Sequence, residues 1–286
     1  MLVSHIIIIR VFPRDVQQKV VFAVMFGIVL SQHLYSTVFY YAEYRFDSTT
    51  FTMMLLSRLI SLSSNYRDGD PRFAKELSKY QERFKVEKMP SIIETTAFAY
   101  HGSGAISGSW FEFRDCMDHF HKRGVYSEIP IGKCVRLSIQ RAITGLLCVY
   151  IHLLISPYFH VDYCATSLFA TYTMPYKMVF MYVTLEGVLF FYFTAFCFLD
   201  STNHACGISF NGYAEITSPE GNKTSPSSKE KGEPLFNRVI NIKLWKFLTG
   251  TDIREIINSW NVSIHNWLKY YVYVRQLVPG QKPGWR

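Results

Sequence analysis

Three long apolar segments constrain this chain more than any other feature of its sequence. They run from Val16 to Tyr41, from Cys134 to Pro157 and from Pro175 to Leu199. Each segment reaches the roughly 20 residues that a helix needs to cross the hydrocarbon core of a bilayer. A helix satisfies every backbone polar group within the segment, which lipid demands of a spanning structure. We therefore expect an all-α, multi-pass integral membrane protein.

Composition agrees with a membrane protein that also carries long polar loops. Aromatic residues make up 16% of the chain and charged residues 18%, below the quarter typical of soluble domains. The net charge is +8, and the basic residues stand beside the apolar segments, which favours an anionic lipid surface over nucleic acid as partner. The six cysteines form no Cys-x-x-Cys pair and predict buried free thiols.

Two shorter apolar segments are expected to be less regular. Phe51 to Leu62 contains Arg58 and predicts a half-buried amphipathic helix. Pro90 to Phe113 carries three glycines between Gly102 and Gly108, and basic loops flank it on both sides. The positive-inside rule would put both loops in the cytosol, which a single span cannot satisfy. We therefore expect a re-entrant hairpin that breaks at the glycines.

We expect residues 1–286 to form a single membrane-embedded domain that is incomplete at both ends. The first ten residues are too short to span a bilayer, and an upstream helix could end there. Residues 217–233 are rich in Ser, Pro, Glu, Lys and Gly, which predicts a mobile polar loop.

An amphipathic helix is predicted from Thr251 to Arg275. Asp252 can cap its start, because Glu255 follows three residues later as in a capping box. The apolar residues recur at helical spacing and form one wide stripe. Asn258, Asn261 and His265 then fall in a polar row beside that stripe, as a lipid-accessible reaction chamber would need. The alternative is a surface helix with a polar edge.

The run Trp260-Asn261-Val262-Ser263-Ile264-His265-Asn266-Trp267 resembles the Trp-Asn motif of the membrane-bound O-acyltransferases (MBOAT), in their lysophospholipid acyltransferase branch. Further blocks resemble that branch in the same order along the chain. They include Asp68-Gly69, Met89-Pro90-Ser91-Ile92-Ile93-Glu94, Phe210-Asn211-Gly212-Tyr213 and Asn241-Ile242-Lys243-Leu244-Trp245-Lys246.

The resemblance implies transfer of a fatty acyl group from acyl-CoA, as co-substrate, to the free hydroxyl of a lysophospholipid in the endoplasmic reticulum membrane. No other cofactor and no metal are expected. Asn261 would be catalytic, orienting the hydroxyl or donating to an oxygen through its amide. Trp260, Trp267 and Asn258 would contact substrate. We also expect Asn261 to face a cavity, with Trp260 and Trp267 packed behind it.

The family's second active-site residue is a histidine in a Trp-His-Gly motif on the next hydrophobic segment. These 286 residues contain no such motif. We therefore expect a chain truncated before the catalytic histidine and inactive alone, with His265 as the candidate substitute base.

The chain departs from the family at Ser109, at Lys243 and at Ile264-His265, which weakens any inference about which lipid is bound. Two alternatives stay open. One is an acyltransferase acting on a sterol or a protein. The other is a non-enzymatic transporter or lipid-binding scaffold, for which ionisable His152 and Glu186 inside predicted spans would be suited. Asn261 would then be a polar residue that closes a helix–helix hydrogen bond.

Overall fold

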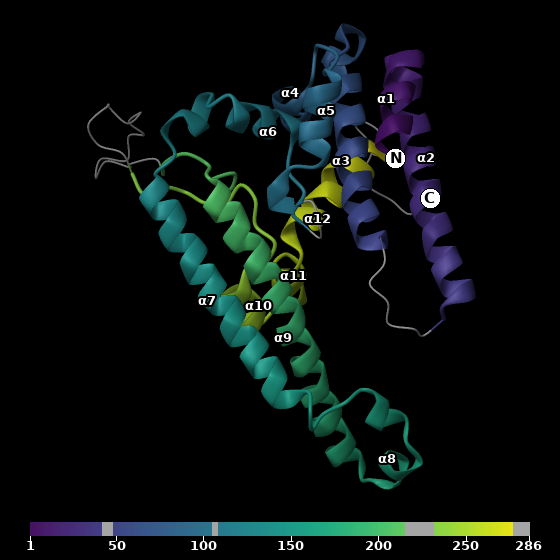
Figure 1. The fold of residues 1–286 in the computed structure, drawn as a ribbon, viewed down its shortest axis with the longest axis vertical. Coiled ribbons are helices and arrows are strands. Elements are labelled where there is room, and N and C mark those ends of the chain that lie inside the picture. Colours follow the sequence, from purple (N-terminus) through teal and green to yellow (C-terminus); the bar gives the residue numbers. More distant parts are fainter. Residues whose placement is uncertain (42–47, 105–107, 215–231, 277–286) are drawn as a thin grey trace. The chain divides into compact units, whose positions relative to one another are not determined.

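The computed structural model describes residues 1–41, 48–104, 108–214 and 232–276, and they form helices joined by turns and loops (Figure 1). The pairing of Tyr213 with Pro234 is an isolated antiparallel bridge. The all-α prediction is therefore confirmed. The chain divides into two compact units. The first unit holds Met1–Ile129, Ile208–Val239 and Ser263–Arg286, and the second holds Pro130–Gly207 and Ile240–Val262. The prediction of a single membrane-embedded domain remains untested.

The first unit is built from short and long helices. Its α-helices are α1 (Leu2–Val11), α2 (Arg14–Phe39), α3 (Thr49–Asp68), α4 (Lys79–Phe84), α5 (Ile92–Ala99) and α6 (Phe113–Phe120), and α12 (Val262–Trp267) begins at its boundary. Short turns of other helix types are η1 (Pro71–Glu76), η2 (Gly102–Gly104), η3 (Gly124–Glu128), the π-helical η5 (Leu268–Tyr273) and η6 (Val274–Gln276).

Helix α3 lies at the centre of this unit, in contact with α1, α2, α4, α5 and α6. The prediction of a half-buried helix here is wrong, because almost every residue from Met54 to Asp68 is buried. Its serines explain the error. The hydroxyls of Ser57 and Ser61 donate to the carbonyls of Met54 and Arg58 at 2.8 Å. A serine whose hydroxyl donates to a carbonyl of its own helix can be buried without an unpaired polar group. The polar face of α3 can therefore pack against protein and need not face solvent.

The segment 90–113 breaks at its glycines, as predicted. Helix α5 ends at Ala99, and the fully buried Arg58 holds the chain beyond that end. Its guanidinium donates to the carbonyls of Phe98 (3.2 Å), Ala99 (2.9 Å) and Ser109 (3.3 Å). The bond to Ala99 satisfies a carbonyl at the end of α5, where intrahelical donors run out, and the bond to Ser109 holds the later chain to the same guanidinium. Residues 105–107 lie outside the described part, and entry into a membrane remains a prediction.

The second unit contains a pair of long helices that run side by side, α7 (Ile131–Ile155) and α9 (Met174–Cys206) (Figure 1). Between them come η4 (Asp162–Ala165) and α8 (Ser167–Thr171), and α10 (Leu244–Thr249) and α11 (Ile253–Ile257) complete the unit. Gly187 of α9 lies so close to α7 that a Cβ there would meet Cγ2 of Ile155 at 2.8 Å. Small residues at such contacts let membrane helices approach closely.

Three helices of the described chain are long and apolar enough to cross a membrane, namely α2, α7 and α9. They coincide with the three predicted spans, which are confirmed as long helices. Many of their large apolar side chains are exposed, as lipid-facing residues would be; Leu146 and Leu147 are each 57% exposed. The predicted polar loop 217–233 lies outside the described residues except for Gly232 and Glu233.

Candidate active site

The Trp-Asn segment, residues 251–275, is not one helix. Helix α11 ends at Ile257, residues 258–261 form a turn, and α12 begins at Val262. Asn261 adopts the left-handed conformation with φ of +42°. Asparagine reaches this region at lower cost than most residues, and the side chains of Asn258 and Ser259 can compete for helix hydrogen bonds. The predicted continuous helix 251–275 is therefore wrong, and so is the single polar row of Asn258, Asn261 and His265.

A chain of hydrogen bonds within the second unit fixes the backbone beside Asn261. The Val262 N–H donates to the carbonyl of Asn241 at 2.9 Å, and the Lys243 N–H donates to the carbonyl of Ser259 at 3.0 Å. Asn241 in turn donates from its backbone N–H and its amide Nδ2 to Oδ1 of Asp200, at 2.8 and 2.9 Å. Asp200 is a buried residue of α9. The turn that presents Asn261 is thus anchored to a long helix through Asn241.

Trp260 lies in an aromatic cluster of the second unit. Its ring centroid is 5.0 Å from that of Phe196, 5.2 Å from Phe247 and 5.9 Å from Phe193. Trp267 is buried in a different hydrophobic cluster, in the first unit. The two tryptophans therefore do not share a helix face behind Asn261, contrary to the prediction. Their contact with substrate remains a prediction.

The other predicted site residues have plain surroundings. Asn258 is exposed at the end of α11. His265 is half-buried on α12, and no hydrogen bond to its imidazole ring is seen among the described residues. His152 bonds through Nδ1 to the carbonyl of Gly187 at 2.9 Å, a helix–helix contact that favours a structural role. Glu186 is half-buried on α9. Their proposed roles in substrate contact or transport are not tested by this geometry.

A buried polar cluster surrounds Tyr271 of the Trp-Asn segment, and the sequence did not predict it. The Tyr271 hydroxyl lies 2.7 Å from both carboxylate oxygens of Glu112 and 2.8 Å from Oδ1 of Asn65. Asn65 Nδ2 donates to Glu112 Oε2 at 2.8 Å, and the Tyr80 hydroxyl donates to Oε1 at 2.5 Å. The ring of Tyr80 also stacks on that of Tyr270 at 3.6 Å between centroids. These contacts fasten η5 to α3, α4 and the chain before α6.

The Glu112 carboxyl is strongly perturbed. Burial raises its pKa from 4.5 to about 7, and hydrogen bonds from Tyr80, Tyr271 and Asn65 oppose that rise only in part. Burial and the nearby Glu112 charge also raise the pKa of the Tyr271 hydroxyl. Glu112 stands between two phenylalanines in the sequence, with no spacing that distinguishes it from an exposed residue.

The end of the described chain is held by a second contact. Arg275 forms a two-pronged ion pair with the buried Asp68, with nitrogen–oxygen distances of 3.0 and 2.6 Å. The adjacent Gly69 admits the backbone of Val86: a Cβ at Gly69 would overlap the Val86 carbonyl. Val86 in turn donates to the carbonyl of Asn65 at 2.8 Å. The Asp68-Gly69 block thus needs both residue types for a physical reason.

Comparison with known proteins identifies relatives along the whole chain. The model of the "MBOAT, membrane-bound O-acyltransferase family" matches residues 8–286. Lysophospholipid acyltransferase 6 of Drosophila melanogaster is 25% identical over 98% of this chain and 38% of its own length. The lysophospholipid acyltransferase of Saccharomyces cerevisiae is 25% identical over 84% of this chain and 40% of its own length.

Lysophospholipid acyltransferase 5 of Homo sapiens is 23% identical over 98% of this chain and 54% of its own length. The chain thus spans about 38% to 54% of the length of these relatives. Because the family model covers nearly all of its residues, the chain belongs to the membrane-bound O-acyltransferase family.

Proposed function

We propose that this chain supplies the asparagine of an acyl-transfer site that acylates lysophospholipids in the endoplasmic reticulum membrane. The observation that carries the proposal is Asn261, which stands in a left-handed turn anchored through Asn241 to Asp200. Strained polar residues held by surrounding structure are common at active sites. The relatives named lysophospholipid acyltransferases support the acceptor.

The proposed donor is acyl-CoA. The lysophospholipid hydroxyl oxygen would form a bond to the acyl carbon, the carbon–sulfur bond of the thioester would break, and the departing thiolate would receive the proton. Such a reaction needs a positioned base and hydrogen-bond donors toward the developing oxyanion. The Asn261 amide does not titrate, so its role would be to donate to an oxygen or to orient the hydroxyl.

The proposed base is the histidine of the family's Trp-His-Gly motif, which is not among these 286 residues. A positioned base contributes about a hundred- to ten-thousand-fold in rate. We therefore propose that these residues alone do not turn over, and that His265 does not replace the base.

The test compares two proteins in microsomes: the 286-residue chain, and the same chain joined to the histidine segment of a relative. Labelled acyl-CoA is supplied with a panel of lysophospholipids. In the joined protein, Asn261→Ala should abolish transfer while Asn266→Ala, a matched change in the same segment, should not. Near-normal turnover by Asn261→Ala would remove the role proposed for Asn261. Activity in the short chain that disappears with His265→Ala would make His265 the base.

A further inference from the structure

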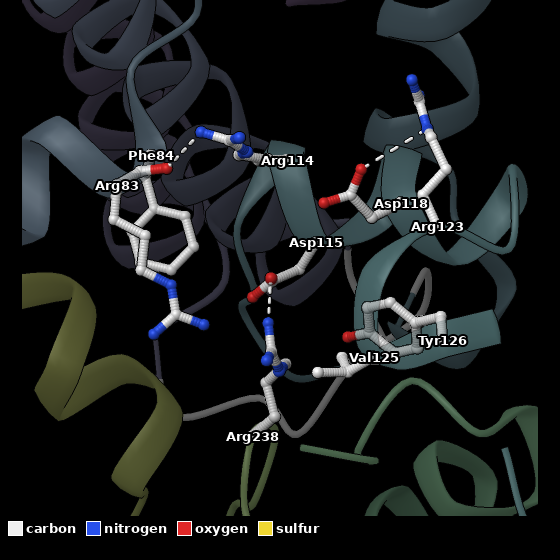
Figure 2. A pocket seen from close by; sticks show the side chains of 9 residues that line it. All are labelled: Arg83, Phe84, Arg114, Asp115, Asp118, Arg123, Val125, Tyr126 and Arg238. Carbon is white, nitrogen blue, oxygen red and sulfur yellow. Dashed lines mark hydrogen bonds and ion pairs between the residues drawn. The ribbon is translucent and has the colours of Figure 1, made fainter. Parts of the chain in front are cut away.

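The first unit contains a pocket lined by four arginines (Figure 2). Its volume is about 380 Å³. Its walls come from the end of α4, from α6, from η3 and from the segment before Val239. The lining residues are Arg83, Phe84, Arg114, Asp115, Asp118, Arg123, Val125, Tyr126 and Arg238.

Both carboxylates of the pocket already have cationic partners. Asp115 pairs with Arg238, and these two side chains are only 8% and 10% exposed. Arg238 is fixed further by Asn211, whose Oδ1 accepts from it at 3.1 and 2.7 Å. Asp118 lies 3.6 Å from Arg123. The buried pair therefore forms a nearly neutral part of the pocket wall; Figure 2 marks its contact with a dashed line.

The remaining arginine charge is not neutralised by these carboxylates. Arg114 donates from Nη1 to the backbone carbonyl of Arg83 at 2.7 Å, which positions the guanidinium and leaves its charge in place. The Arg83 guanidinium lies 5.0 Å from the ring centre of Phe84. The Asp115 carboxylate attracts it, but that carboxylate is already paired with Arg238. The side chains of Arg83 and Arg114 are both exposed at the pocket. The lining thus carries four arginine charges against two aspartates.

A second hollow of about 290 Å³ extends this surface. It shares Arg114, Asp118 and Arg123 with the first and adds Lys88. Its one further carboxylate, on Glu94, accepts from the Ser91 N–H at 2.8 Å in a capping box. The positive excess therefore continues from one hollow into the next.

We propose that this arginine pocket binds a phosphate-bearing anion. Guanidinium groups offer paired N–H donors that match the oxygens of phosphate, and they stay charged at every physiological pH. The volume lies within the range of small-ligand sites, large enough for a phosphate and part of the group that bears it. Two sources share this chemistry: the nucleotide phosphates of a soluble co-substrate, and the head group of a phospholipid. The proposal does not depend on acyl transfer, because binding is measured directly.

The test titrates the full chain, purified in detergent micelles, with three probes by calorimetry. The probes are adenosine 3′,5′-bisphosphate, monomeric short-chain phosphatidic acid, and adenosine without phosphate. We expect at least one phosphate probe to bind tenfold or more tightly than adenosine, because charge-assisted hydrogen bonds of this kind contribute about that factor or more. The tighter of the two phosphate probes identifies the source.

Paired variants separate a built site from diffuse charge. Arg83→Gln with Arg114→Gln removes two exposed guanidiniums of the pocket and should weaken phosphate binding about tenfold or more. The matched control, Lys75→Gln with Lys79→Gln, removes two exposed charges of the same unit that do not line the pocket. It should leave the affinity within about twofold, because neither ammonium group lines the pocket and exposed charges that do not touch a ligand are screened by solvent and salt. Equal weakening by both pairs, or no preference of the wild type for phosphate over adenosine, would overturn the proposal.

Discussion

Replacing Glu112 by glutamine should change how the stability of this protein depends on pH. The carboxyl is buried, its pKa is raised to about 7, and its oxygens accept from Tyr80, Tyr271 and Asn65. Glutamine keeps the shape of the side chain and one acceptor oxygen but has no charge. The Asn65 side-chain amide can flip so that its oxygen accepts from the new glutamine amide. The packing around the site is therefore retained.

The size of the effect follows from the two pKa values. The unfolded carboxyl releases its proton near pH 4.5, whereas the folded one keeps it up to about pH 7. Between these pH values the folded state binds more protons than the unfolded state. The stability that protonated Glu112 contributes is therefore complete below pH 4.5 and is lost as pH rises through 7. At about 1.4 kcal/mol for each pH unit, the wild type should lose about 3 kcal/mol relative to Glu112→Gln across this window.

The measurement is the free energy of unfolding in detergent micelles from pH 4 to 8, for wild type and variant. The difference between the two proteins isolates Glu112, because the histidines and other carboxyls titrate in both. Asp115 disfavours the Glu112 charge and Arg275 is attracted to it, so both remain in place in this comparison. A difference that stays constant over the whole range would refute the reasoning. It would mean that water reaches the carboxyl and holds its pKa near 4.5.

Two further predictions concern the second unit. Asn241→Ala removes the 2.9 Å amide bond to Asp200 and should cost about 1–3 kcal/mol, with faster hydrogen exchange at the Val262 N–H; unchanged exchange there would show that Asn241 does not anchor the Asn261 turn. Gly187→Ala should destabilise the α7–α9 pair by about 1–3 kcal/mol in thermal unfolding, because the new Cβ meets Ile155 at 2.8 Å. Gly132→Ala, where a Cβ meets nothing within 4 Å, serves as its control and should cost far less.

The sequence predicted those elements that depend on a single strong signal. Apolar length alone predicted helices α2, α7 and α9, because lipid leaves few other ways to satisfy the backbone. The break after Ala99 followed from glycines close together. Those signals are local, and local signals can be read without knowing the fold.

The errors lie where a contact distant in sequence decides the structure. Helix α3 was expected to be half-buried, since no local pattern reveals that five other helices surround it. The segment 251–275 has helical periodicity, yet its backbone turns at Asn261 because Asn241 and Lys243 make hydrogen bonds to it from outside the segment. Glu112 was overlooked for the same reason: its partners lie 32 to 159 residues away in the chain.

The blocks that carry the family resemblance are explained by these distant contacts. Asn241 opens one block, and it connects Asp200 to the backbone next to Asn261. Asp68 and Gly69 form another, and they hold Arg275 and admit the Val86 backbone. Neither block need touch a substrate to matter, because Asn241 fixes the backbone at Val262 and Asp68 holds Arg275 further along the same segment. The preorganisation that catalysis requires depends on such supporting residues as much as on the reacting groups. A change at Asn241 or Asp68 should therefore affect the segment from a distance, and the exchange of the Val262 amide reports the first of these effects without any assay of acyl transfer.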